Sequence, residues 1–483
     1  MGGLLEFVLT CVCVWIITAE TPAKSVGDAF EKLGVHPGVC ANLTKELAIT
    51  KPTEIQAAAL PSLLKGNSVT FYAETGSGKT LCKACSFILL FLFPYFFFLL
   101  SSFFFPSSSF LLSSFFFLSS FLLLPFFFFF ANLTLSSGYL LPVVSGVLRT
   151  KEASEGSNRF YLKALILEPS LELAIQVHSI LQTLAKDLPL KIHMIGSGFG
   201  VELGRDVDIL VSTPGSLKHF DLSSLFSNLE HVVLDEADVL LDGGNKRSIH
   251  DILSVINSLQ QADKPPPQYI FSAATLPATA LKSPLMFIQD HYPGIEKIKT
   301  TGVHRPVPTL KERFIELPGS QKLSMLLNLL NEGAGDKKKK TLIFVRTLEQ
   351  AKKLGDFLES QKVEKSVLSK TETAASRVDL MHQYMDGNFT NLVCTDLASR
   401  GLDFPEVERV IQYDFALNAV DYLHRAGRTA RNGRAGEVVS FVDLGDRDLA
   451  RAIQKVETID NLSTLFSRNR LFRNKIRKAA KKQ

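Results

Sequence analysis

The sequence predicts an α/β protein with two domains, each a parallel sheet flanked by helices. In the first half of the chain, helix-length segments alternate with short apolar runs that end in small or polar residues: NSVTFYAETG, KALILEPS, DILVSTPG, HVVLDEAD and QYIFSAATLP. After residue 335 a second set follows: KTLIFVR, NLVCTDLA, ERVIQYDF and GEVVSFVD. This alternation is typical of doubly wound sheets, whose ligands bind at the carboxyl ends of the strands.

Length and composition leave room for two such domains and for tails. The chain has 483 residues, of which 46% are hydrophobic and 21% charged. Between the two sets of runs lie GVHRPVP and ELPGS, whose prolines indicate a linker. The expected parts are a terminal segment at 1–27, a first domain at 28–295 with an insertion at 82–138, a linker at 296–320, a second domain at 321–450 and a tail at 451–483.

The two ends of the chain differ in character. The net charge of +5 is concentrated in residues 468–482, which hold eight Lys and Arg and no acid, so the tail is either a solvated end or a contact for phosphate backbones. The apolar run from Phe7 to Ile17 has the length of a signal-peptide core, but Glu6 stands where a basic residue is usual. A targeting segment and a wrongly assigned start both remain open. Six cysteines at irregular spacing give neither a disulfide framework nor a zinc pattern.

A glycine-rich segment directly follows the first apolar run. Glycines after a strand let backbone N–H groups converge on phosphate oxygens, a lysine adds a positive charge at the terminal phosphates, and a threonine hydroxyl can hold magnesium. Lys79 and Thr80 fit the last two roles. The residues expected to bind the nucleotide here are Thr75, Gly76, Ser77, Gly78, Lys79 and Thr80.

Two adjacent acids end the run HVVL. Beside a phosphate loop, Asp235 can coordinate Mg²⁺, in part through water, and Glu236 can orient or deprotonate the attacking water. Acidic residues are also common at the start of a helix, so this pair alone is weak evidence for a metal site. Together with the glycine-rich segment, it predicts hydrolysis of a nucleoside triphosphate.

The third candidate group is HRAGRTAR at 424–431, in the second half of the chain. Clustered arginines are costly to bury unless anions meet them, although a surface patch is the simpler alternative. Arginines that reach the γ-phosphate from another domain would make hydrolysis depend on domain closure.

These motifs, in this order, resemble those of the DEAD-box RNA helicases of superfamily 2, over residues 28–450 outside the insertion. The resemblance implies two tandem RecA-like domains, ATP and Mg²⁺ as cofactors, and RNA as the partner. Phe30, upstream of KPTEIQ, and Gln56 would read the adenine, and Asp403 would lie near the ribose.

The same resemblance assigns the catalytic parts. Arg428 and Arg431 would act as arginine fingers, alongside the phosphate-binding Lys79 and the acids Asp235 and Glu236.

The segments that resemble the family's RNA-facing motifs depart from them. Leu171 stands where PTRELA has an arginine, and Ser216 replaces the arginine of TPGR. These helicases grip the sugar-phosphate backbone, so sequence preference must come from outside the core. The residues expected to contact RNA are Pro169, Thr213, Pro214, Gly215, Arg377, Thr395 and Arg400.

Four residues are expected to couple hydrolysis to RNA: Asp238, Ala273, Thr275 and His424. The family's SAT motif reads from Ala273 to Thr275 when it is aligned from the following LP, or contains an extra residue if Ser272 fills the first place. We therefore expect weak strand separation.

A finer resemblance is to a plant and algal subgroup of plastid DEAD-box helicases associated with assembly of the large ribosomal subunit. It rests on AATLP, on YDFALNAVDYLHRAGRTAR and on the ending FSRNRLFRNKIRKAAKK. It implies an organelle, with a plastid preferred and a mitochondrion left open, and rRNA and pre-ribosomal proteins as partners of a monomer. The nucleolus and the cytoplasm remain alternatives.

Residues 86–130 contain, apart from Ile88 and Tyr95, only Phe, Leu, Ser and Pro. The codons of these amino acids can consist of pyrimidines alone, so a retained intron explains the tract. The tract is also long enough for a membrane span, but no charge between Lys83 and Arg149 sets an orientation. A soluble insert is the third alternative. We favour the retained intron and do not expect stable membrane association.

The predicted function is an ATP-dependent RNA helicase that hydrolyses ATP to unwind or remodel RNA and RNA–protein complexes, with a role in organellar ribosome assembly. A non-catalytic RNA-binding scaffold with the same fold is the alternative, indicated by Leu171, Ser216 and Ala273. A membrane-tethered ATPase would depend wholly on the tract at 86–130.

Overall fold

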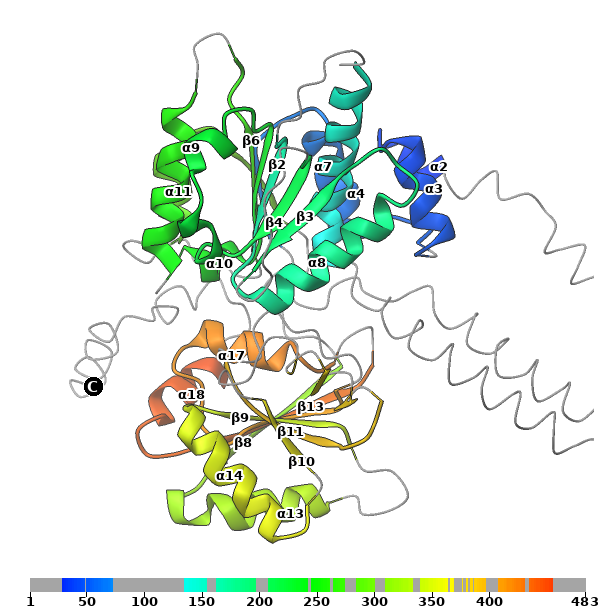
Figure 1. Cartoon of the computed structure of the whole chain (residues 1–483). Helices are drawn as coiled ribbons and strands as arrows, with labels where there is room; N and C mark the ends of the chain where they lie inside the picture. The colour runs from blue at the N-terminus through cyan, green and yellow to red at the C-terminus, as the bar shows by residue number, and fades with distance from the viewer. Residues whose placement is uncertain are drawn as a thin grey trace, which may run out of the picture.

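The structure, a computed structural model, has an α/β fold with two parallel sheets, each flanked by helices (Figure 1). This confirms the predicted fold class. The residues that it describes are 28–47, 49–72, 134–153, 162–196, 207–241, 245–260, 264–273, 284–299, 309–332, 339–363, 365–368, 376, 379–380, 383–384, 386–396, 407–430 and 434–454.

The first sheet has seven strands in the order β3-β4-β2-β5-β6-β1-β7, with all neighbours parallel. The strands are β1 (Val69–Tyr72), β2 (Ala164–Leu167), β3 (Ile192–Ile195), β4 (Ile209–Ser212), β5 (His231–Leu234), β6 (Gln268–Ala273) and β7 (Glu296–Lys299). Because they are parallel, the carboxyl ends of β1, β6, β5, β2 and β4 form one continuous edge.

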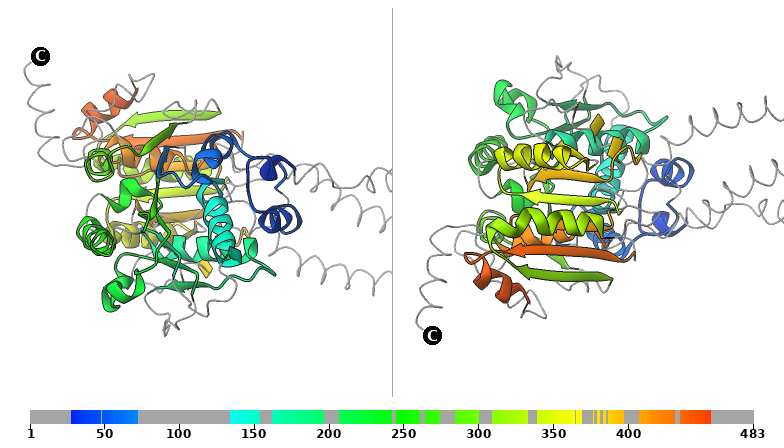
Figure 2. Two further views of the ribbon diagram at one scale, coloured as in Figure 1. Left: turned by 90° about the horizontal axis from the view of Figure 1, so that it is seen from above. Right: turned by 90° about the horizontal axis from the view of Figure 1, so that it is seen from below.

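Helices cover both faces of this sheet. They are α2 (Asp28–Glu31), α3 (Pro37–Lys45), α4 (Glu54–Leu63), α7 (Thr134–Ala153), α8 (Leu171–Leu184), η3 (Ser216–His219), α9 (Leu222–Leu225), α10 (Ala237–Leu240), α11 (Lys246–Ser258) and α12 (Pro284–His291). Ala164 and Ile166 of β2 enter one apolar core with α3, α4, α7 and α8, whereas Leu165 and Leu167 enter another with α9 to α12. In the left view of Figure 2, the cyan α7 and the green α11 accordingly lie on opposite sides of the strands. Side chains alternate across a strand, so an all-apolar strand needs both helical layers.

The second sheet has six strands in the order β10-β11-β9-β12-β13-β8. The strands are β8 (Leu310–Glu316), β9 (Thr341–Val345), β10 (Lys365–Leu368), β11 (Asn391–Thr395), β12 (Arg409–Gln412) and β13 (Gly436–Val442). The accompanying helices are η5 (Gly319–Gln321), α13 (Lys322–Asn331), α14 (Leu348–Ser360), α17 (Ala419–Ala426) and α18 (Arg447–Gln454). Two apolar cores flank this sheet as well.

The segment expected to be a linker, 296–320, supplies the edge strands β7 and β8 of the two sheets. Glu296 pairs with Val69, and Leu310 pairs with Gly436. The physical reason is that an open sheet edge offers unpaired backbone groups, and pairing them outweighs the local proline signal.

Helix α7 begins at Thr134, inside the segment expected to be an insertion. Residues 82–133 lie outside the described ranges, as do 1–27 and 455–483. Among the helices of the described ranges, none is both long and apolar enough to cross a membrane. The tract at 86–130 is not part of those ranges, so this finding does not bear on it.

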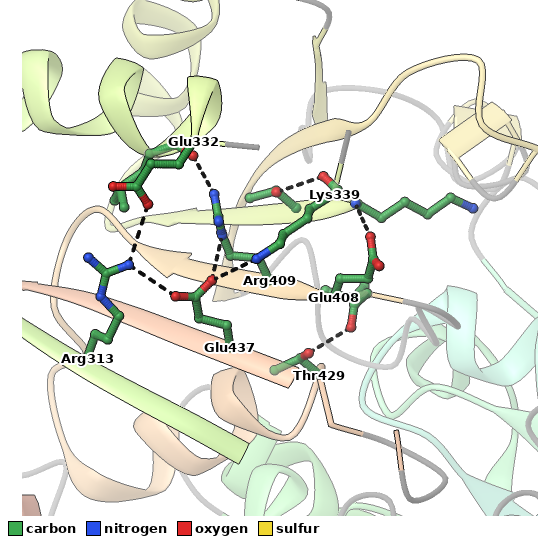
Figure 3. A network of polar contacts seen from close by, with 11 residues as sticks. Arg313, Glu332, Lys339, Glu408, Arg409, Thr429 and Glu437 are labelled. Atoms are coloured by element: carbon green, nitrogen blue, oxygen red, sulfur yellow. Dashed lines mark hydrogen bonds and ion pairs between the residues drawn. The ribbon is translucent and has the colours of Figure 1, made fainter. Parts of the chain in front are cut away.

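A network of ion pairs joins strands at one side of the second sheet (Figure 3). Arg409 on β12, only 3% exposed, donates from Nε to Oε2 of Glu437 at 3.0 Å and from Nη1 to the carbonyl oxygen of Leu329. Arg313 donates to Oε1 of Glu437 at 3.1 Å, and Lys339 lies 3.5 Å from Oε2. Both carboxylate oxygens therefore have cationic partners, which compensates their partial burial.

Candidate nucleotide and RNA site

Asp235 follows β5 at the carboxyl edge of the first sheet and is only 6% exposed. The pairing of Leu234 with Phe271 brings it beside Ser272, near the end of β6. Its Oδ1 accepts a hydrogen bond from the Glu236 amide at 2.9 Å, and its Oδ2 accepts one from the Tyr139 hydroxyl at 2.8 Å. The carboxylate is therefore held from two sides.

The charge at this edge is unbalanced among the described residues. Burial, and then the neighbouring charge of Glu236, raise the pKa of Asp235 to about 6, although hydrogen bonds from Ser272, Tyr139 and the Glu236 amide oppose the shift. Glu168, at the end of β2, is fully buried, and burial followed by the charges of Asp235 and Glu236 raises its pKa well above the ordinary value. A cation would relieve this repulsion.

The donor set fits a magnesium ion. Mg²⁺ prefers carboxylate, hydroxyl, water and phosphate oxygens, and Asp235 presents a buried carboxylate where a phosphate loop is expected. Its predicted companion ligand Thr80 lies outside the described residues.

Glu236 has a left-handed backbone, with φ 44° and ψ 49°. For a residue with a side chain, this conformation costs on the order of 1–3 kcal/mol and is found most often where function requires it. The turn directs the chain from β5 into α10, and it sets the position of the acid that we expect to activate water.

Phe30 and Gln56, the expected adenine-reading residues, are both buried. Gln56 closes a capping box at the start of α4. Its side-chain Oε1 accepts a hydrogen bond from the Thr53 backbone amide at 2.8 Å, and its backbone amide donates to Thr53 Oγ1 at 3.4 Å. Phe30 packs into the apolar core that contains α3 and α4. The local fold thus fixes both side chains, and their contact with a base stays a prediction.

Arg425, the first arginine of HRAGRTAR, makes its contacts within the second domain. It is 2% exposed, and its Nε and Nη2 donate to the two oxygens of Asp396 at 2.6 and 2.7 Å. Its Nη1 also donates to Gln412 Oε1 at 3.2 Å and to the Asp414 carbonyl at 2.6 Å. The anion that meets this arginine is therefore part of the protein. Arg428, 9% exposed, lies two residues after the end of α17.

A contact between the two domains joins the motifs. His424 Nε2 on α17 lies 3.3 Å from Asp238 Oδ2 on α10, and the two side chains are 15% and 5% exposed. Figure 1 shows α10 and α17 facing each other across the boundary between the domains. The structure thus brings together two residues that were expected to couple hydrolysis to RNA.

The expected RNA-facing residues of the first domain lie along the same edge. Because Leu167 pairs with Ser212, Pro169 after β2 and Thr213 after β4 follow adjacent strands, and Pro214 and Gly215 come next in the turn. Thr213 Oγ1 and Ser216 Oγ are 2.8 Å apart. In the second domain, Thr395 is the last residue of β11.

Leu171 packs against the backbone at the end of β3. A Cβ atom added to Gly196 would meet Leu171 Cδ1 at 2.1 Å, so a larger residue there would have to displace the Leu171 side chain. An apolar contact thus occupies the place where the family has a charged side chain. Of the coupling candidates, Ala273 ends β6 beside Tyr72 of β1.

Several expected site residues lie outside the described ranges, so their placement stays a prediction. They are Thr75, Gly76, Ser77, Gly78, Lys79, Thr80, Thr275, Arg377, Arg400, Asp403 and Arg431.

Comparison with known families follows the same division of the chain. The family model described as DEAD/DEAH box helicase matches residues 53–102 and 134–283, and the helicase conserved C-terminal domain matches 321–433. A Mus musculus protein named "Probable ATP-dependent RNA helicase DDX28" is 30% identical over 455 residues, which cover 88% of this chain and 73% of that protein. The chain belongs to the DEAD-box ATP-dependent RNA helicase family. Enzymes of this family are RNA-stimulated ATPases, so the predicted enzyme class is confirmed at the level of the family.

Two further DEAD-box relatives are plant proteins. DEAD-box ATP-dependent RNA helicase 39 of Arabidopsis thaliana is 28% identical over 458 residues, which cover 92% of this chain but only 64% of that protein. Helicase 22 of the same plant is 25% identical over 544 residues, which cover 94% of this chain and 84% of that protein. Helicase 22 is thus a relative, at lower identity than helicase 39 and DDX28.

Solved DEAD-box structures share the fold. Saccharomyces cerevisiae Dbp5 L327V, bound to RNA and ADP BeF3, matches with a TM-score of 0.65 at 21% identity and covers 94% of this chain and 99% of its own. Mss116p, bound to ssRNA and AMP-PNP, matches with a TM-score of 0.65 at 18% identity and covers 89% of this chain and 77% of its own. These likenesses confirm two tandem RecA-like domains.

Three residues near the Asp235 carboxylate were not among the predicted site residues: Ser272, Tyr139 and Glu168. The alternative alignment of SAT from Ser272 was a signal for the first. Tyr139 and Glu168 gave none, because their contacts join segments that are far apart in the sequence.

Proposed function

We propose that this DEAD-box protein hydrolyses Mg²⁺·ATP to remodel RNA and RNA–protein complexes. The contact between His424 and Asp238 carries the proposal, because it joins the edge with Asp235 and Glu236 to the helix that precedes Arg428. A site completed by two domains responds to whatever closes them, and RNA that spans both domains would do so.

In this proposal Asp235 and Thr80 hold the ion, Lys79 contacts the terminal phosphates, and Glu236 orients or deprotonates water. A bound magnesium ion would supply charge neutralisation for the transferring phosphoryl group. Arg428 and Arg431 would stabilise the same charge from the second domain.

We further propose rRNA as the substrate and an organelle, with a plastid preferred, as the location. A relative from Sclerotinia sclerotiorum, 27% identical over 452 residues, is named as an ATP-dependent rRNA helicase. The eight Lys and Arg residues of 468–482 suit a phosphate backbone, and the apolar segment at 7–17 suits a targeting signal. Pre-ribosomal proteins would be further partners.

The test is ATP turnover with and without single-stranded RNA. Two versions are compared, the full chain and one lacking 82–133, which keeps the whole of α7. We expect RNA to accelerate turnover in the shortened chain and Glu236→Gln to abolish that turnover in a matched control. RNA binding without acceleration would instead indicate a scaffold. Equal stimulation in both versions would show that the insertion is tolerated.

A further inference from the structure

The hydroxyl of Tyr139 lies between two carboxylates at the edge of the first sheet. It is 2.8 Å from Asp235 Oδ2 and 3.2 Å from Glu168 Oε1. Tyr139 and Glu168 are 0% exposed, and Asp235 is 6% exposed. Water is therefore kept from these groups, and each contact replaces one that water would otherwise make.

The three residues come from three different elements. Tyr139 belongs to α7, Glu168 follows β2, and Asp235 follows β5. The pairing of Leu167 with Leu234 places Glu168 and Asp235 at the same level of adjacent strands. The hydroxyl therefore ties α7 to the strand ends that bear the acids.

We propose that Tyr139, anchored by Glu168, is a positioning residue that holds the Asp235 carboxylate in the orientation required to bind Mg²⁺. The inference rests on the proposed role of Asp235 as a magnesium ligand. Metal-ligating carboxylates depend on such outer partners, because a free carboxylate rotates and its unused oxygen loses its hydrogen bond.

The number of protons available to the two contacts of Tyr139 determines the role of Glu168. A phenol has one proton, so Tyr139 can donate to only one carboxylate, and Asp235 is the nearer of the two. The remaining contact requires a donor on Glu168. A protonated carboxyl supplies this donor, and the complete burial of Glu168 favours its uncharged form. Among the described residues, Glu168 Oε2 has no hydrogen-bond partner.

The test measures how Mg²⁺ promotes binding of a fluorescent ADP analogue, N-methylanthraniloyl-ADP, to the full chain. Removing an outer partner of a metal ligand weakens the metal about 10- to 100-fold, so Tyr139→Phe should raise the half-saturating Mg²⁺ concentration by about tenfold. Tyr269→Phe is the matched control, since its hydroxyl bonds Asn257 at 2.8 Å elsewhere in the same domain. This control should leave the Mg²⁺ dependence unchanged.

Two further results distinguish positioning from general damage. In the ATPase assay, Tyr139→Phe should regain turnover near that of the unmodified chain once Mg²⁺ is saturating, whereas a disrupted fold would not. Glu168→Gln keeps a donor for the phenol oxygen and should retain the normal Mg²⁺ dependence, while Glu168→Leu should behave like Tyr139→Phe.

An unchanged Mg²⁺ dependence in Tyr139→Phe overturns the inference while leaving the proposed function intact. A tenfold loss in Glu168→Gln overturns the part assigned to Glu168, because the amide preserves the hydrogen bond. If neither the unmodified chain nor the version lacking 82–133 shows Mg²⁺-dependent binding of the analogue, the proposed function fails, and the inference fails with it.

Discussion

His424 Nε2 of the second domain lies 3.3 Å from Asp238 Oδ2 of the first, and both side chains are largely buried. Asp238 stands two residues after Glu236, and His424 stands four residues before Arg428. One contact thus connects the acid expected to activate water with the arginine expected to reach the phosphate. Its geometry ties the chemistry to the relative position of the two domains.

Replacing His424 with alanine should reduce RNA-stimulated ATP turnover while leaving ATP binding to the first domain unchanged. The reason is that the contact between His424 and Asp238 forms only when the two domains are closed, whereas ATP binding to the first domain does not need it. A double-mutant cycle with Asp238→Asn should give a coupling energy of about 1 kcal/mol in the stimulated rate. His291→Ala, an exposed histidine on α12, is the control. Strictly additive effects of the two substitutions would argue against the coupling.

Glu236→Gln should retain ATP and RNA binding but lose hydrolysis by a factor on the order of 10²–10⁴, the usual contribution of a general base. The substitution preserves the shape of the side chain and removes only its charge and basicity. Filter binding of labelled RNA with ATP, together with phosphate release, measures the two properties separately. Normal phosphate release would refute the water-activating role.

Arg428→Ala and Arg425→Ala should have different effects although the two residues are three positions apart. Without Arg428, hydrolysis should fall by a factor on the order of 10³–10⁵, as for arginine fingers in general. Without Arg425, the Asp396 carboxylate, which is 24% exposed, loses both of its guanidinium contacts, so the second domain should unfold at lower temperature. Thermal unfolding and ATP turnover of both variants test the distinction. A normal turnover in Arg428→Ala would show that the second domain does not complete the site.

Arg409→Leu should destabilise the protein by about 1–3 kcal/mol, because Glu437 loses its buried partner and the Leu329 carbonyl loses its donor, although Arg313 and Lys339 remain. Lys339→Ala removes another partner of the same carboxylate. Because the Lys339 side chain is 46% exposed, this substitution should lower the free energy of unfolding by less than about 1 kcal/mol. Urea unfolding monitored by circular dichroism compares the two variants. Equal losses would mean that burial of Arg409 does not determine the contribution.

The same carboxylate predicts a pH dependence. Burial alone raises the pKa of Glu437, but hydrogen bonds and charges of Arg313 and Arg409 outweigh it and hold the pKa below its ordinary value of 4.5. The ionised form therefore stabilises the fold above pH 4.5, and this contribution disappears as the pH falls through the lower folded pKa. Glu437→Gln should flatten this part of the acid-unfolding curve. A curve of the same steepness in the variant would contradict the assignment.

Much of the fold and part of the site could be predicted from local patterns. Short apolar runs with small or polar ends predicted parallel strands, and parallel strands place their carboxyl ends at one edge. Asp235 and Pro169 were therefore expected along that edge, and they follow β5 and β2 there. The linker was harder to predict: prolines are a local signal, whereas β7 and β8 form because two distant sheet edges are open.

The sequence by itself determined the fold class, the family and the identity of the acids and arginines, because each is encoded in a short contiguous string. Only the tertiary structure decided which of these groups meet. It pairs Arg425 with the protein's own Asp396, places Tyr139 between Glu168 and Asp235, and brings His424 to Asp238. The physical reason is that a buried polar side chain must find its partner among the residues that packing delivers, and packing brings together positions that no local pattern relates.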